Sequence, residues 1–104
     1  MATIEEICEV ISAKQQISYD CPSGNHVAGE RLGNPHIVFI TKGGEEVVLI
    51  WKLRGVQTDP SRPLPSWRNY KLRDIQILRT LEEFSPESSF NPNAPIYKRT
   101  ICSV

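Results

Sequence analysis

The sequence predicts a mainly β fold in which one N-terminal helix, residues 3–14, precedes a small, strongly bent sheet or barrel of about five short strands, residues 15–84. Three observations lead to this prediction. The chain begins with a helix-capping pattern, residues 47–51 form an unbroken apolar run, and turns containing glycine or proline recur at short intervals. With 104 residues, the chain is long enough for one domain with one modest core.

The helix is expected to begin just after Thr3. Thr3 followed by Glu6 is a capping box, in which each side chain accepts a hydrogen bond from the backbone N–H of the other residue. Apolar residues at helical spacing follow: Ile4, Ile7, Val10 and Ile11. The predicted helix is amphipathic, and its acidic exposed side makes it a poor candidate for contact with nucleic acid.

The strands of the first half are separated by turn residues. A short strand is expected at 16–19, a second near 27–32 and a third at 36–41. Gly43-Gly44 then predicts a two-residue hairpin turn into the central strand, residues 45–55.

The second half begins with a loop at 56–66, whose three prolines indicate a rigid connection rather than a ligand segment. Alternation returns at 67–75 and predicts another strand. Residues 75–84 fit a helix or a strand, and the context favours a strand. The C-terminal tail, 85–104, is expected to be irregular, although residues 96–104 can add a last extended segment.

The central strand indicates where basic side chains gather. Successive side chains of a strand point to opposite faces, so Lys52 and Arg54 share the face of Val48 and Ile50. Because residues 47–50 are apolar on both faces, the strand is expected to begin buried and to end with one basic edge.

The net charge of zero hides an uneven distribution. Residues 1–30 hold five acidic residues and one basic residue, whereas residues 31–73 hold eight basic and three acidic residues. A basic central region is typical of proteins that bind phosphate-rich or acidic ligands. The alternative is a solvated surface whose cations pair with the acidic helix.

The cysteines and the N-terminus favour a cytoplasmic protein. Cys8, Cys21 and Cys102 are an odd number with no close pair, which predicts three free thiols in a reducing compartment. The first residues lack the layout of a signal peptide, and no apolar run approaches the roughly 20 residues that span a bilayer. Cys21, His26 and His36 have no recognised zinc spacing, so no metal site is expected.

Motifs for catalysis are missing from the chain. It contains no G-x-S-x-G, P-loop, G-x-G-x-x-G or H-E-x-x-H sequence. Glu82 and Glu83 are adjacent, and on a strand they would point to opposite faces. We therefore expect neither an enzyme nor a cofactor.

The basic residues are organised in two pairs. Lys52 and Arg54 share one strand face, Lys71 and Arg73 share another, and a tryptophan accompanies each pair. If the two strands are neighbours, these side chains would form a groove with cationic walls and an aromatic platform, on which bases stack.

Three segments, in order along residues 14–84, together resemble a WYL domain. They are residues 31–36 (Arg-Leu-Gly-Asn-Pro-His), the strand ending Trp-Lys-Leu-Arg-Gly at 51–55, and residues 67–75 (Trp-Arg-Asn-Tyr-Lys-Leu-Arg-Asp-Ile). In this resemblance, Arg31 and His36 correspond to the first conserved segment of the family.

The family's closing segment, Arg-x-Phe-Arg, corresponds here to Arg68 and Lys71, with Tyr70 at the buried aromatic position. The resemblance implies an Sm-like five-stranded barrel preceded by a helix. It also implies ligand sensing in bacterial transcription regulation, where several such domains bind nucleotides or single-stranded nucleic acid through a basic groove. Too few residues precede the barrel for a winged helix-turn-helix, so we expect a stand-alone WYL-like protein.

Two functions follow as hypotheses. The first is a non-enzymatic module that binds a nucleotide or a short single-stranded nucleic acid. The second is a protein interaction or assembly module, which would pair its barrel edges with a regulatory partner or with another copy of itself. The ligand-binding residues expected for the first are Arg31, His36, Lys52, Arg54, Trp67, Arg68, Lys71 and Arg73.

Overall fold

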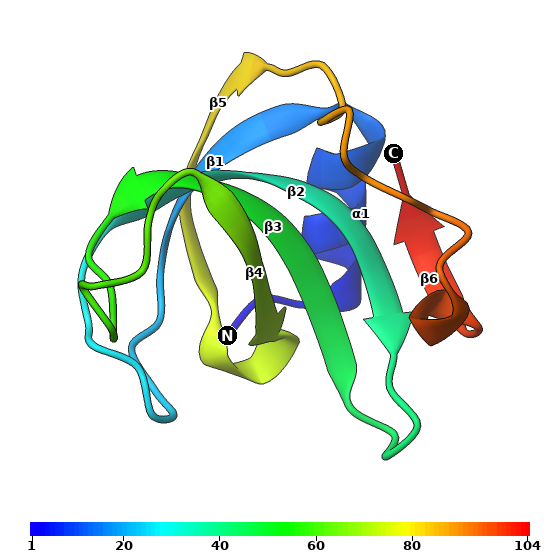
Figure 1. Cartoon of the computed structure of the whole chain (residues 1–104), viewed down its shortest axis with the longest axis horizontal. Coiled ribbons are helices and arrows are strands. Elements are labelled where there is room, and N and C mark those ends of the chain that lie inside the picture. Colours follow the sequence, from blue (N-terminus) through cyan, green and yellow to red (C-terminus); the bar gives the residue numbers. More distant parts are fainter.

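The structure, a computed structural model, describes residues 1–104 and combines one α-helix with an antiparallel sheet of six strands (Figure 1). The elements are α1 (Ile4–Ser12), β1 (Gln15–Asp20), β2 (Arg31–Ile40), β3 (Glu46–Gly55), β4 (Ser66–Lys71), the 3-10 helix η1 (Leu72–Asp74), β5 (Gln76–Glu83), the 3-10 helix η2 (Pro95–Tyr97) and β6 (Thr100–Ser103). The predicted mainly β fold with one N-terminal helix is confirmed.

The sheet is organised around β2, which has three neighbours. One edge of β2 pairs with β3 along its length, and the opposite edge is divided between β1 at residues 31–33 and β6 at residues 37–39. The main strand order is β4-β3-β2-β1-β5, so β4 and β5 are edge strands. No backbone pairing joins β4 to β5, and the sheet is therefore not closed into the expected barrel.

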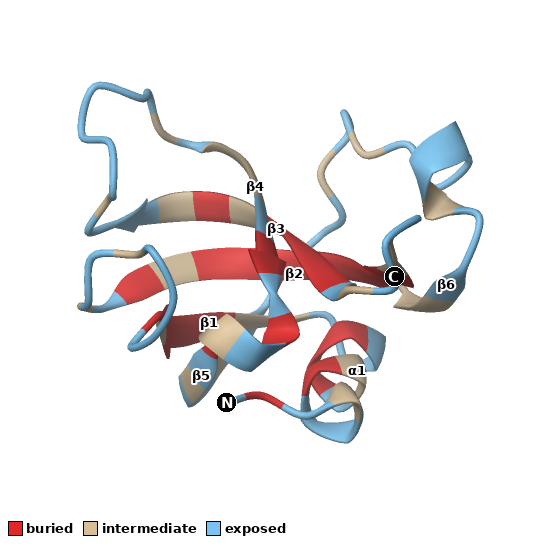
Figure 2. Ribbon diagram, turned by 90° about the horizontal axis from the view of Figure 1, so that it is seen from below, coloured by how far each residue is buried: buried red, intermediate tan, exposed pale blue.

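Both faces of the central strands are covered (Figure 2). α1 lies against one face, where its buried side chains Ile7, Val10 and Ile11 join the larger core, and each contributes about 1.5–3 kcal/mol. On the other face, Phe90 and Tyr97 from the C-terminal segment pack against a smaller cluster. That cluster consists of Ile37, Phe39, Val47 and Leu49. Residues 47–50 are buried on both faces, as the sequence predicts.

The N-terminal helix forms as its capping box predicts. The Glu6 N–H donates to Thr3 Oγ1 over 3.1 Å, and the Thr3 N–H donates to Glu6 Oε1 over 3.0 Å. These bonds satisfy backbone donors that the first helical turn leaves without partners.

The strands predicted near 27–32 and at 36–41 are one continuous strand, which starts later than expected. Residues 21–30 form a loop, and β2 starts at Arg31 and continues through Pro35 to Ile40. Proline cannot donate to the sheet, and the register between β2 and β3 shifts just after Pro35, so an irregularity lets the strand continue. The hairpin turn is also longer than predicted, because the Gly44 N–H bonds to the Thr41 carbonyl and the turn includes Lys42; Gly44 has a positive φ of 87°.

The second half of the chain differs from the prediction at one strand end: the strand expected over 67–75 ends at Lys71 and is followed by η1. The last extended segment that the sequence allows within 96–104 forms as β6, which pairs with β2, so the C-terminal tail is not irregular throughout. Residues 75–84, which fit either a helix or a strand, contain β5, so the preference for a strand is confirmed.

The prediction of three free thiols is wrong. Cys8 on α1 and Cys102 on β6 form a disulfide, and Cys21 alone is free and buried. The two residues are 94 positions apart and become neighbours only because α1 and β6 lie beside β2. The disulfide removes the argument from free thiols for a reducing compartment. No helix has the length and apolar character needed to cross a membrane.

Candidate functional site: a cationic cavity between β3, β4 and two loops

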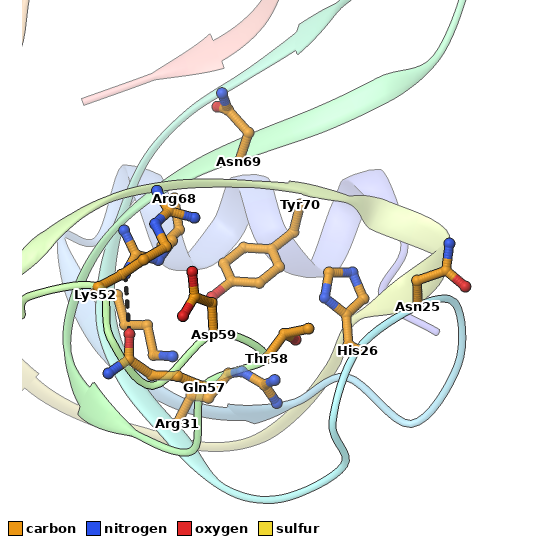
Figure 3. Close-up of a pocket in the computed structure, with 11 residues that line it drawn as sticks. Asn25, His26, Arg31, Lys52, Gln57, Thr58, Asp59, Arg68, Asn69 and Tyr70 are labelled. Atoms are coloured by element: carbon orange, nitrogen blue, oxygen red, sulfur yellow. Dashed lines mark hydrogen bonds between the residues drawn. The ribbon is translucent and has the colours of Figure 1, made fainter.

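A cavity of about 300 Å³ lies between β3, β4 and the loops 21–30 and 56–65 (Figure 3). Ten of its eleven lining residues are polar or charged. They are Asn25, His26, Arg31, Lys52, Gln57, Thr58, Asp59, Arg62, Arg68 and Asn69, and Tyr70 completes the lining. Three of the predicted ligand-binding residues, Arg31, Lys52 and Arg68, thus converge on one cavity.

Arg31 lies at the start of β2 and is only 1% exposed. Its guanidinium donates to the carbonyls of Gly29, over 3.1 Å, and Val27, over 2.7 Å, and thereby holds the loop 21–30 in place. The nearest carboxylate oxygen, Asp20 Oδ1, is 4.0 Å from Nη1. The Arg31 Nε is buried without a hydrogen-bond partner. An unpartnered donor on a buried cation is costly.

Gly55 allows the end of β3 to approach Arg31. Its φ is +119°, and a Cβ atom at this position would lie 2.5 Å from the Arg31 Cα. Any residue with a side chain would therefore displace β2 from β3 beside the cavity.

Lys52 lies on β3 and is 2% exposed, so it does not form the exposed basic edge that the sequence predicts. Its Nζ donates to the Val56 carbonyl over 2.5 Å. Burial, followed by the positive charges of Arg31 and Arg68, lowers the pKa of Lys52 from 10.5 to about 8.

Arg68 on β4 forms, together with Arg31 and Lys52, the cationic end of the cavity. Its guanidinium donates to Gln57 Oε1 over 3.0 Å and to the Ser66 hydroxyl. Burial, and then the charge of Arg62, lower the pKa of Arg68. None of the five ion pairs in the structure includes Lys52, Arg62 or Arg68.

One carboxylate, that of Asp59, lines the cavity. It is exposed and accepts hydrogen bonds from the Ser61 N–H at 3.0 Å and the Ser61 hydroxyl at 2.6 Å, which lower its pKa. The lining therefore carries a marked excess of positive charge.

An aromatic end faces this cationic end. Figure 3 shows His26 beyond the Tyr70 ring, on the side away from Arg31, Lys52 and Arg68. The ring centroids of His26 and Tyr70 are 5.7 Å apart. The Tyr70 hydroxyl forms a 3.1 Å hydrogen bond with the Tyr19 hydroxyl, which fixes the ring, and His26 Nε2 lies 3.6 Å from Asp74 Oδ2.

The sequence predicts that Arg54 shares the face of Lys52, and this prediction is wrong. Between Lys52 and Arg54 the register with β2 shifts, because the two residues pair with the adjacent positions Gly33 and Leu32. The extra residue, Leu53, interrupts the alternation of faces. Arg54 lines a second cavity of about 400 Å³, whose lining also includes Glu30, Arg79 and, shared with the first cavity, Arg31.

Lys71 and Arg73 lie far from Lys52 along the sheet. β3 and β4 are neighbours, as expected, but they are antiparallel: Lys52 pairs with Ser66, and Lys71 pairs with Val47 at the other end. The two cations lie beside Glu45 Oε1, at 3.9 Å from Lys71 Nζ and 3.5 Å from Arg73 Nη2. These cations form ion pairs within the chain, although their partner is Glu45 and not the acidic helix.

The aromatic platform lies on the opposite face of the sheet from the cations. Trp51 and Trp67 pair across β3 and β4, with ring centroids 4.9 Å apart. Because Arg68 follows Trp67 in the same strand, its side chain points to the other face. The combined groove of cations and tryptophans that the sequence predicts is therefore absent.

His36 lies with Trp67 on this second face and is fully buried. Its Nδ1 is 2.8 Å from the Asn34 carbonyl, and its Nε2 accepts from the Glu87 N–H over 2.9 Å. Burial lowers its pKa and favours the neutral ring. Both nitrogens have protein partners, so His36 fixes the C-terminal segment and does not line the cavity.

His26, Gln57 and Arg62 line the cavity but are not among the predicted ligand-binding residues. For Gln57 and Arg62 a signal exists in the sequence, because the loop at 56–65 joins the strands that carry Lys52 and Arg68. His26 lies in the other loop, 21–30, for which the sequence offers no such signal.

No group of three His, Cys, Asp or Glu side chains is positioned to hold a metal ion. Comparison of the chain with protein-family models, with curated proteins and with solved structures finds no match. The geometry of the cationic cavity is therefore the main evidence on function.

Proposed function

We propose that this chain is a non-enzymatic binding module, and that the cationic cavity binds a phosphate group of a nucleotide or of a short single-stranded nucleic acid. The observation that carries the proposal is the convergence of Arg31, Lys52 and Arg68 on one cavity, with no carboxylate paired to Lys52 or Arg68. Buried cations normally have an anionic partner, and a bound phosphate would supply it.

The arrangement suits phosphate for a second reason. The planar guanidinium groups of Arg31 and Arg68 can each donate two hydrogen bonds to phosphate oxygens, and Lys52 adds a compact positive charge. A bound anion would also relieve the repulsion that lowers the pKa of Lys52.

The resemblance to WYL domains supports the same function. The order β4-β3-β2-β1-β5, with η1 between β4 and β5, is compatible with an open form of the Sm-like barrel. Two of the residues that carry the resemblance, Arg31 and Arg68, line the cavity. On this proposal the chain senses its ligand in the cytoplasm of a bacterium and contributes to transcription regulation through a partner protein.

The test is fluorescence anisotropy of short labelled DNA and RNA single strands at about 50 and 200 mM salt, a range over which release of counterions weakens binding steeply. We expect binding that falls with salt and that Arg68→Glu weakens at least tenfold. Arg73→Glu is the matched control, because Arg73 carries the same charge outside the cavity. Absence of binding at low salt to these strands and to mononucleotides, or equal loss in the two variants, would contradict the proposal.

A protein interaction module is the second candidate, and the open sheet favours it. The outer edge of β5 has no strand partner, and Leu78 on this strand is 44% exposed. This function predicts a concentration-dependent mass in solution that Leu78→Lys reduces to that of a monomer. A strict monomer across dilution would contradict self-assembly.

A further inference from the structure

The cationic cavity has two chemically different ends. Arg31, Lys52 and Arg68 form one end, and the rings of Tyr70 and His26 form the other (Figure 3). A ligand that fits both ends carries negative charge on one side and a planar ring on the other.

The size of the cavity limits the ligand to about one nucleotide. Its volume of about 300 Å³ is at the lower end of the range of roughly 300–1,000 Å³ found for small-molecule sites. Several linked nucleotides would need an extended groove, and the remaining predicted cations do not provide one. Arg54 lines the second cavity, which shares only Arg31 with the first and holds the ion pair of Glu30 with Arg79, and Arg73 is paired with Glu45.

The depth of the cations favours a phosphate at the end of a molecule. Arg31 and Lys52 are 1% and 2% exposed, so the phosphate must enter the cavity to contact them. A phosphodiester inside a strand continues on both sides and carries one charge, whereas a phosphate monoester is attached on one side only. The monoester also carries about −1.5 to −2 charges at pH 7 and three acceptor oxygens.

We propose that the cavity recognises a phosphate monoester attached to one planar ring, with the phosphate between Arg31, Lys52 and Arg68 and the ring beside His26 and Tyr70. A nucleoside monophosphate and the phosphorylated end of a strand share this chemistry. The inference rests on the proposed function and specifies which phosphate the site binds.

Calorimetric titration of the whole chain separates the two claims. The probes are adenosine 5′-monophosphate, adenosine, inorganic phosphate, and one short single strand with and without a terminal phosphate. We expect the monophosphate to bind at least tenfold more tightly than adenosine or inorganic phosphate. The terminal phosphate should strengthen binding of the strand by a similar factor if the strand end is the source. If only the monophosphate binds, the free nucleotide is the source.

Two results would overturn the inference. In the first, the single-stranded nucleic acid binds equally with and without its terminal phosphate, and the monophosphate does not compete with it. The site then binds internal phosphates, and the proposed function holds although the inference fails. If none of the probes binds, both fail.

Variants test the two ends separately. Arg68→Gln should weaken binding of the monophosphate and of inorganic phosphate, whereas His26→Ala should weaken binding of the monophosphate alone. Arg73→Gln, outside the cavity, should change neither. Equal affinity of the His26→Ala and wild-type proteins for the monophosphate would refute the proposed ring site.

Discussion

Lys52→Met should stabilise the fold and abolish phosphate binding. Methionine has a similar length and no charge, so it removes the buried cation and keeps most of the packing. The pKa of Lys52 falls from 10.5 to about 8 in the folded chain, and each pKa unit corresponds to about 1.4 kcal/mol. At pH 7 the protonated side chain therefore costs the fold about 3 kcal/mol. The substitution also loses the hydrogen bond to the Val56 carbonyl, worth about 1 kcal/mol, which leaves a net gain of about 2 kcal/mol.

The gain depends on pH with a defined sign. Between about pH 8 and pH 10.5 the unfolded chain binds a proton at Lys52 that the folded chain lacks, so the free energy of unfolding of the wild type rises with pH. The advantage of Lys52→Met should therefore shrink by about 2 kcal/mol between pH 7 and pH 9.5. Comparison of the two proteins cancels the contributions of tyrosines and Cys21 that titrate over the same range.

The assay is urea denaturation of both proteins at pH 7 and pH 9.5, with Arg54→Met as a control. Arg54 is an exposed cation on the same strand, and its loss should change the free energy of unfolding by less than about 0.5 kcal/mol. If Lys52→Met is less stable than the wild type at pH 7, with a difference that does not vary with pH, Lys52 is a favourably paired residue and the reasoning is refuted.

Three further predictions concern pH, the second face and the disulfide. Affinity for adenosine 5′-monophosphate should fall about tenfold between pH 7 and pH 9, because Lys52 deprotonates with a pKa of about 8; a flat profile would contradict its role as a phosphate ligand. The free energy of unfolding should fall as the pH drops below about 6.5, because burial lowers the pKa of His36 and only the unfolded chain takes up the proton there; His36→Gln should reduce this dependence, and an unchanged acid profile would count against it. Reduction of the Cys8–Cys102 disulfide should lower the free energy of unfolding by about 2–4 kcal/mol, because the disulfide cross-links residues 94 positions apart and so restricts the unfolded chain. A Cys8→Ser variant should then show no response to reductant.

Local patterns in the sequence predict the local structure well. The capping box of Thr3 and Glu6 locates the helix, and strict alternation places residues 47–52 on the correct faces of β3. These features depend on residues a few positions apart, so a single segment contains the necessary information.

Strand pairing determines the site and is not visible in any one segment. Lys52 and Lys71 lie on neighbouring strands, yet the antiparallel register places them at opposite ends. The shift between Lys52 and Arg54 directs their side chains to different cavities. The register follows from packing of the whole sheet, which spacing along the chain does not reveal.

The disulfide is also invisible in any single segment of the sequence. Cys8 and Cys102 approach each other only after α1 and β6 have both packed beside β2. His36 is similar: the sequence predicts a ligand-binding residue. In the folded chain the C-terminal segment packs over it, and both of its ring nitrogens have hydrogen-bond partners within the protein.

An NMR titration of the Lys52 Nζ resonance tests most directly whether the cationic cavity is a phosphate site. The pKa is measured first in the free protein and then with saturating adenosine 5′-monophosphate. In the free protein, the pKa of Lys52 should be about 8, because the side chain is buried without an anionic partner. This pKa should rise by at least one unit when the phosphate binds. A pKa near 10.5 that the nucleotide leaves unchanged would contradict the claim that this cavity is a phosphate site.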